Sequence, residues 1–205
     1  MAKRVEIISK MDVFQKSIFR IEEVRLRHQC YDGSMSDEFD RLNLDRGDSV
    51  AAILHDQKAD TVILVEQFRY PAYEKGPGWM IELPAGIVKS GIDATPDITI
   101  RREIVEETGY SVETLQHINT FYLSPGGSSE RVLLYYASIT PGDHVGKGGG
   151  LRENGEDIRT LIITVDNALE KVTKGEIVDA KTIIGLQWLQ VHRLHRAIAS
   201  LSIRV

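Results

Sequence analysis

Three features are scarce or missing in this 205-residue sequence, and each excludes a class of protein. Cys30 is the single cysteine, so no disulfide can form within the chain, and we expect a reducing compartment, the cytoplasm. No apolar run reaches the roughly 18 residues of a membrane span, and the basic start lacks the apolar stretch of a secretory signal. Basic residues (25) are fewer than acidic ones (30), and the net charge of −5 disfavours nonspecific nucleic-acid binding.

What is present is the composition of a globular protein, with 42% hydrophobic and 27% charged residues. The first 45 residues alternate apolar and polar positions, with a strand ending near His28 and a turn at 31–34. We therefore expect an N-terminal antiparallel β extension over residues 1–45 and a main domain over residues 46–205.

The main domain mixes predicted strands and helices without a regular β-α-β alternation. This order favours an α+β fold, an α/β/α sandwich, over a doubly wound sheet. The glycine-rich stretch 141–156 is predicted to be a long loop. Strands are predicted at 49–55, 61–68, 79–83, 117–122, 131–139 and 158–165, and helices at 95–108, 166–174 and 180–201.

The first helix of the main domain has clear start and stop signals. Thr95 is expected to cap it, Pro96 suits its first position, and Gly109 is expected to end it. At about 100° per residue, three glutamates share an arc of roughly 100° on this helix. They are Glu103, Glu106 and Glu107. The apolar residues expected to pack against a sheet are Ile98, Ile104 and Val105.

This acidic arc has two interpretations. Glu103 repels both other glutamates, and all three lie toward the C-terminal end of the helix, where its dipole disfavours anions. A solvated acidic face would tolerate these small costs. A bound Mg²⁺, which prefers oxygen ligands, would offset them.

Residues 102–110, REIVEETGY, resemble the second half of the Nudix box, G-x5-E-x7-R-E-U-x-E-E-x-G-U, where U is aliphatic or aromatic. Gly86 resembles its opening glycine. The intervening stretch is two residues longer than usual, and Ala94 stands where the first glutamate is expected, beside Asp93. The resemblance implies the Nudix fold, an α/β/α sandwich around a mixed β-sheet, and Mg²⁺ as cofactor, with Mn²⁺ as a substitute.

Further segments resemble those of bacterial ADP-ribose pyrophosphatases: 65–69, 79–86, 124–131, 156–159 and 186–189. This resemblance implies hydrolysis of ADP-ribose to AMP and ribose 5-phosphate by a homodimer whose N-terminal β segment crosses to the partner. GDP-mannose or another nucleoside diphosphate sugar is an alternative substrate. A non-catalytic sensor of nucleotide sugars is the alternative of another class, and a local β extension on a monomer is the alternative to the dimer.

Carried over position by position, the resemblance implies a metal site formed by Glu103, Glu107 and the carbonyl of Ala85, with Glu106 assisting. Glu156 would bind a further metal or act as the base that activates water. Its other interpretation is a solvated loop carboxylate. Arg102 would orient a box glutamate or be a surface partner of Glu106.

The resemblance also implies a substrate site. Arg69 would bind phosphate and Glu82 the nucleoside side, with Gly86 beside them, although Arg69 and Glu82 could each belong to an exposed ion pair. Phe19 and Arg41 are candidates for a wall of the nucleotide pocket that the partner subunit provides. An aromatic residue in such a strand can equally fill a core or an interface.

Overall fold

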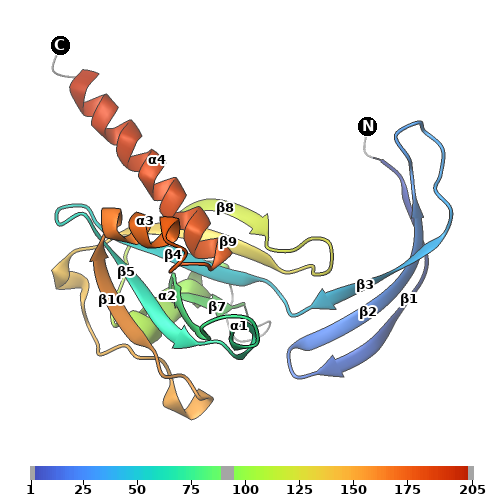
Figure 1. Cartoon of the computed structure of the whole chain (residues 1–205), viewed down its shortest axis with the longest axis horizontal. Coiled ribbons are helices and arrows are strands. Elements are labelled where there is room, and N and C mark those ends of the chain that lie inside the picture. Colours follow the sequence, from blue (N-terminus) through green and yellow to red (C-terminus); the bar gives the residue numbers. More distant parts are fainter. Residues whose placement is uncertain (1–2, 89–94, 203–205) are drawn as a thin grey trace. The chain divides into compact units, whose positions relative to one another are not determined.

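The computed structural model describes residues 3–88 and 95–202 (Figure 1). By their internal contacts these residues form two compact units. Unit 1 comprises Met1–Asp48 and Tyr122–Arg131, and unit 2 comprises Ser49–Phe121 and Val132–Val205. Asp93 and Ala94, the residues at the position of the first glutamate of the box, lie outside the described residues.

Unit 1 is built on a three-stranded antiparallel sheet in the order β1-β2-β3. Its strands are β1 (Val5–Lys16), β2 (Phe19–His28) and β3 (Phe39–Asp45). The predicted turn after His28 is present, and Ser34 donates to the carboxylate of Asp32 there. No separate strand was predicted for β1, which carries two register shifts against β2 that interrupt its alternation.

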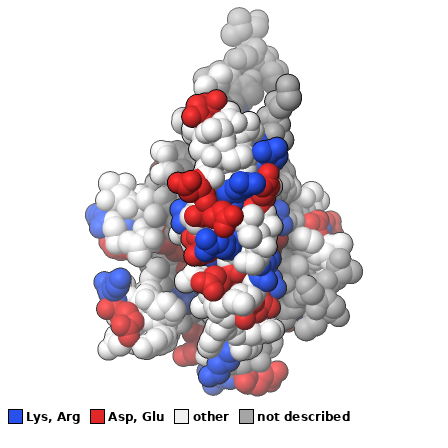
Figure 2. Space-filling view, turned by 90° about the vertical axis from the view of Figure 1, so that its right-hand side faces the viewer, with Lys and Arg blue, Asp and Glu red and all other residues white. Residues whose placement is uncertain are grey.

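Charged side chains are paired across the sheet of unit 1. Glu22 is 3% exposed, lies 2.7 Å from the ammonium of Lys10 and 3.1 Å from Arg20, and accepts a hydrogen bond from Asn43. The Lys10 and Asn43 hydrogen bonds hold the pKa of Glu22 below its usual range, against the effect of burial. Among the described side chains on the face shown in Figure 2, acidic and basic ones are interleaved and form no patch of one sign.

Unit 2 contains a mixed sheet in the order β10-β5-β4-β9-β8. Its central strand β4 runs antiparallel to β5 and parallel to β9. The strands are β4 (Ser49–Asp56), β5 (Thr61–Phe68), β8 (Gln116–Tyr122), β9 (Arg131–Ser138) and β10 (Arg159–Thr164). The short strands β6 (Trp79–Glu82) and β7 (Ala85–Ile87) pair with β5 and β4.

Helices cover both faces of this sheet. They are α1 (Tyr70–Tyr73), α2 (Pro96–Thr108), α3 (Val165–Thr173) and α4 (Ala180–Ser202). On one face Leu186 and Leu189 of α4 pack with Ile53 and Leu64, and on the other Ile104 of α2 packs with its own cluster. The two buried clusters confirm the predicted α/β/α sandwich. Within the described parts of the chain, no helix is both long and apolar enough to cross a membrane.

The predicted strands and longer helices of unit 2 are found within about a residue of their expected bounds. The one-turn helix α1 follows β5 directly, and no helix was predicted there. Two short 3-10 turns, Pro141–Asp143 and Arg152–Asn154, interrupt the predicted loop at 141–156.

Candidate active site

A split in the sheet of unit 2 creates the position of the site. Strands β4 and β5 pair only from Leu54 to Asp56 and from Thr61 to Ile63. Beyond this point β5 pairs with β6, while the first residues of β4 pair with β7. The link between β6 and β7 therefore crosses the opening, and the Pro84 carbonyl accepts a hydrogen bond from the Ala52 amide at 3.0 Å.

Helix α2 begins and ends at the residues that the sequence predicts. The Thr95 hydroxyl accepts from the Ile98 amide, Pro96 is the first helical residue, and Gly109 ends the helix with φ of 77°, as predicted. A Cβ on Gly109 would lie 2.2 Å from the carbonyl oxygen of Gly146, so the glycine-rich loop contacts the helix end backbone to backbone.

Glu107 lies on the buried side of α2. It is 4% exposed, and its Oε2 accepts a hydrogen bond at 3.0 Å from the amide of Ala85 in β7. Burial raises the pKa of Glu107 to about 8, and the charges of Glu103 and Glu82 add to this rise. A buried carboxylate with so high a pKa has a strong tendency to gain a proton or a cation.

Glu103 lies one turn earlier and packs on Gly86. A Cβ added to Gly86 would lie 2.2 Å from Glu103 Oε1, so only glycine leaves room for the carboxylate. Burial raises the pKa of Glu103, Arg102 opposes this rise, and the charges of Glu106 and Glu156 add to it. The charges of Glu106 and Glu156 thus disfavour the ionised form of Glu103.

Arg102 links two of the glutamates. Its guanidinium lies 3.0 Å from Glu103 and 2.9 Å from Glu106. Arg102 therefore contacts a box glutamate, as its orienting role requires, and it also forms the i,i+4 pair with Glu106. The expected apolar side of the helix is partly wrong, because Ile98 is 47% and Val105 39% exposed. The buried residues are Thr99, Ile100, Ile104, Glu107 and Thr108.

The loop that carries Glu156 packs on the C-terminal end of α2. The amides of Gly149 and Gly150 donate to the carbonyls of Glu107 and Glu106, both at 2.9 Å. Glu156 itself accepts a hydrogen bond at 2.8 Å from the amide of Leu151. The loop therefore satisfies two carbonyls in the last turn of the helix and keeps Glu156 within electrostatic range of Glu103.

Arg69 and Glu82 form a bidentate ion pair, with nitrogen–oxygen distances of 3.0 and 2.9 Å. Glu82 is buried, and Lys181 of α4 also binds it, at 3.0 Å. Although burial opposes ionisation, the Arg69 hydrogen bond and the Lys181 charge hold the pKa of Glu82 below its usual range. The alternative interpretation, an exposed ion pair, is therefore wrong for Glu82, whose carboxylate is buried.

Lys181 and its neighbour Thr182 were missed in the sequence. Thr182 accepts a hydrogen bond at 2.8 Å from the Leu83 amide and donates to Asp179, which fixes the link between β6 and β7. No local pattern signals these contacts, because Glu82 and Lys181 are 99 residues apart.

The donor chemistry of the site fits a divalent cation, because its carboxylates supply the oxygen ligands that such ions prefer. Glu103 and Glu107 lie on neighbouring turns beside the backbone of Ala85 and Gly86. Among residues 3–88 and 95–202, however, no three acidic, histidine or cysteine side chains are gathered around one point. Arg102 and backbone amides hold the carboxylates instead.

Phe19 and Arg41 lie in unit 1. Phe19 is 42% exposed, with the guanidinium of Arg46 5.9 Å from its ring centre. The guanidinium of Arg41 lies 4.4 Å from the ring centre of Phe39. Their assignment to a nucleotide pocket stays a prediction.

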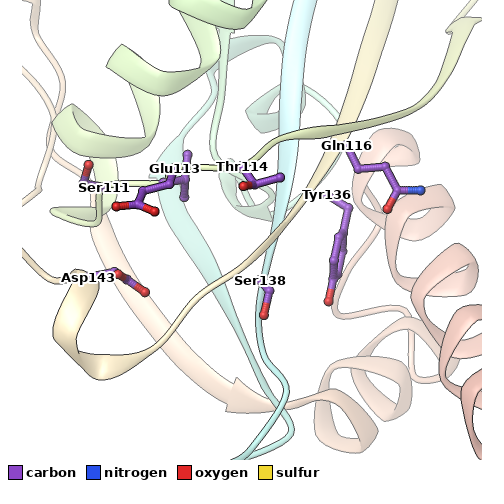
Figure 3. A pocket seen from close by; sticks show the side chains of 8 residues that line it. Ser111, Glu113, Thr114, Gln116, Tyr136, Ser138 and Asp143 are labelled. Atoms are coloured by element: carbon purple, nitrogen blue, oxygen red, sulfur yellow. The ribbon is translucent and has the colours of Figure 1, made fainter.

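A separate pocket of about 330 Å³ lies beyond the C-terminal end of α2 (Figure 3). Glu113, Asp143 and several hydroxyl groups line it, without any lysine or arginine. A diphosphate needs cations, so this lining does not suit one. The full lining is Ser111, Val112, Glu113, Thr114, Gln116, Tyr136, Ser138 and Asp143.

Comparisons with known proteins give matches that extend over most of the chain. Residues 45–183 match the family model described as NUDIX domain. The chain is 34% identical over 199 residues to an ADP-ribose pyrophosphatase of Escherichia coli K12, covering 95% of this chain and 90% of that protein. It is also 34% identical over 193 residues to a GDP-mannose pyrophosphatase of Cronobacter sakazakii, covering 93% and 97%.

A solved structure described as an ADP compounds hydrolase superposes with a TM-score of 0.68 at 15% identity, covering 92% of this chain and 96% of that one. At this identity the superposition supports the fold alone. The family model and the two relatives extend over most of the chain. The chain therefore belongs to the Nudix family.

Proposed function

We propose that this protein hydrolyses the diphosphate bond of ADP-ribose and releases AMP and ribose 5-phosphate. The observation that carries the proposal is the pair of buried carboxylates, Glu103 and Glu107, packed on the Ala85-Gly86 backbone at the split of the sheet. The similarity to proteins named ADP-ribose pyrophosphatase supports the choice of substrate.

The proposed cofactor is Mg²⁺, with Mn²⁺ as a substitute. Glu103, Glu107 and the Ala85 carbonyl would hold it, with Glu106 released from Arg102 to assist. When bound, such an ion neutralises the diphosphate and lowers the pKa of a water molecule. The raised pKa values of Glu103 and Glu107 support this assignment, because a cation would offset the repulsion between the two groups.

The remaining residues act on the substrate. Arg69 keeps 42% of its side chain exposed while Glu82 fixes its guanidinium, so its free edge is available to a phosphate oxygen. Gly86 leaves room for the Glu103 carboxylate, and its own place in the substrate site stays a prediction. We propose that Glu156 accepts the proton of the attacking water or binds a further ion.

A panel of nucleoside diphosphate sugars with Mg²⁺ tests this function. We expect ADP-ribose to be cleaved with the highest kcat/KM, and chromatography should find AMP and ribose 5-phosphate in equal amounts. GDP-mannose is the second candidate, because a relative of equal identity is named GDP-mannose pyrophosphatase. Tight binding of these compounds without turnover would support a sensor and contradict the hydrolase.

We also propose a homodimer formed through unit 1. The strand β1 exposes a series of large apolar side chains, each about half exposed, which a partner surface would cover. These are Val5, Ile7, Ile8, Met11, Val13 and Phe14. Light scattering on the purified chain should give at least twice the chain mass. A monomer at micromolar concentration would support the alternative of a local β extension.

A further inference from the structure

The helix α4 has an apolar stripe on the side opposite to the sheet. Leu186 and Leu189 are fully buried, whereas a second set of apolar side chains on the same helix is exposed. In Figure 1 the C-terminal part of α4 runs beyond the sheet of unit 2. The exposed set is Ile184, Val191, Leu194 and Ile198, at 38%, 51%, 58% and 61%.

The spacing of this stripe is that of a coiled-coil seam. Its steps of seven, three and four residues place Ile184, Val191 and Ile198 at one heptad position and Leu194 at the other. Gln187 occupies the equivalent of Leu194 one heptad earlier. β-Branched residues at the first position and leucine at the second favour a pair of parallel helices, and one polar residue in the seam fixes their register.

The apolar stripe of α4 carries no charged residue, so we expect an uncharged surface on its partner. No aspartate or glutamate occurs from Ala180 to Ser202. Arg193 faces away from the stripe, where it pairs with Asp60 and Asp166, and Arg196 lines the same shallow pocket as Arg193. The stripe therefore lacks the flanking cations that a helix on an anionic membrane uses.

We propose that this stripe pairs in parallel with the same stripe of a second copy of the chain. From Ile184 to Ile198 the seam is about 21 Å long at 1.5 Å per residue, so a straight apolar helix of equal length covers it. A second α4 has this length, this spacing and this absence of charge. The pairing is independent of the proposed hydrolase, because the stripe contains none of the assigned site residues.

Disulfide trapping tests the pairing in the full-length chain. In a Cys30→Ser background, Leu194→Cys places one thiol at the seam, where two parallel helices bring the sulfurs within bonding reach. Arg196→Cys is the matched control on the pocket side of α4. In a glutathione redox buffer we expect a linked dimer for Leu194→Cys and not for Arg196→Cys. Equal linkage at the two positions, or none at Leu194→Cys, would overturn the proposal.

A charge exchange at Val191 gives a second test. In a parallel pair the two copies of Val191 face each other, so Val191→Lys should lower trapping through Leu194→Cys about tenfold. Mixing Val191→Lys with Val191→Glu chains should restore it. Unchanged trapping in Val191→Lys alone would contradict the pairing.

Two further readouts separate other outcomes. Hydrolysis of ADP-ribose by the Val191 variants should equal that of the parent chain, so loss of pairing is distinguishable from loss of the proposed function. Sedimentation with phosphatidylglycerol vesicles should show no binding. Vesicle binding that Val191→Lys abolishes would assign the stripe to a membrane and overturn the pairing.

Discussion

The two units of this chain are stabilised in different ways. In unit 2 the strands β4 and β5 are buried on both faces, and residues such as Ile53 and Leu64 are fully enclosed. Among its described residues, unit 1 has no buried hydrophobic side chain, and its most buried group is the paired carboxylate of Glu22. Strand hydrogen bonds and ion pairs thus hold unit 1, whereas a hydrophobic core holds unit 2.

This difference in burial has one consequence for each unit. Small sheets without an apolar core are marginal in water, and the exposed apolar residues of β1 are the surface of the proposed homodimer. The core of unit 2 is large enough to bury Glu107, a carboxylate that costs stability and that we assign to catalysis.

The largest effect is expected in unit 2. Glu107→Gln removes the charge while keeping the shape, and should lower kcat for ADP-ribose about 10³-fold because it removes a ligand of the proposed cation. The circular dichroism spectrum should be unchanged. Glu113→Gln, an exposed glutamate of the same unit, is the control and should turn over normally. Near-normal turnover by Glu107→Gln would defeat the metal assignment.

Truncation of apolar side chains should separate the units next. Leu64→Ala in the core should cost about 2–5 kcal/mol of unfolding free energy, since it leaves a cavity. Met11→Ala in β1, where the side chain is 60% exposed, should change the stability of the monomer by about 0.5 kcal/mol or less. Urea unfolding checks both at low protein concentration. A cost at Met11 equal to that at Leu64 under this dilution would contradict the comparison.

Two glycines sharpen the contrast at smaller size. Gly86→Ala should lower kcat/KM about 10²-fold, because the new Cβ occupies the position of the Glu103 carboxylate. Gly126→Ala in unit 1, where a Cβ meets no atom within 4 Å, should leave activity and stability unchanged. Equal activities of the two variants would show that Glu103 does not need its present position.

The pH dependence of metal-free stability should have opposite signs in the two units. Glu107, with its pKa raised from 4.5 to about 8, stabilises the fold fully below pH 4.5, and this stability is lost as pH rises toward 8. Glu22 has a lowered pKa, so it stabilises the folded state at pH values above its ordinary pKa. This contribution is lost as the pH falls. At pH 8 the free energy of unfolding of Glu107→Gln should therefore exceed that of the parent chain by on the order of 1–3 kcal/mol.

Amide exchange resolves the two effects by region. Protection of α2 should fall between pH 5 and 8 in the parent chain and stay level in Glu107→Gln, after correction for intrinsic exchange rates. Protection of β2 should fall only in acid, and Glu22→Gln should remove this change. A fall of α2 protection that is the same in parent and Glu107→Gln would exclude Glu107 as its cause.

Local signals made the secondary structure of unit 2 predictable. Thr95, Pro96 and Gly109 fix the ends of α2 through their own backbone chemistry, so neighbouring residues sufficed. The face of α2 was less predictable. Ile98 and Val105 are exposed and Glu107 is buried, because the tertiary position of the helix, rather than polarity, decides which side faces the sheet.

The rest of the site depends on pairs that are distant in sequence. The split between β4 and β5 and the Glu82–Lys181 pair involve residues that no short pattern connects. The strand β7 has three residues and was missed for lack of any periodicity. In unit 1, register shifts hid β1 for a similar reason.

The most direct test of the central claim is binding of Mn²⁺, a paramagnetic substitute for Mg²⁺, by the purified chain with a non-hydrolysable ADP-ribose analogue. Electron paramagnetic resonance measures the free ion. We predict saturable binding that is lost in Glu107→Gln and kept in Glu113→Gln. Binding of equal affinity and stoichiometry in all three proteins would place the ion elsewhere and contradict the account.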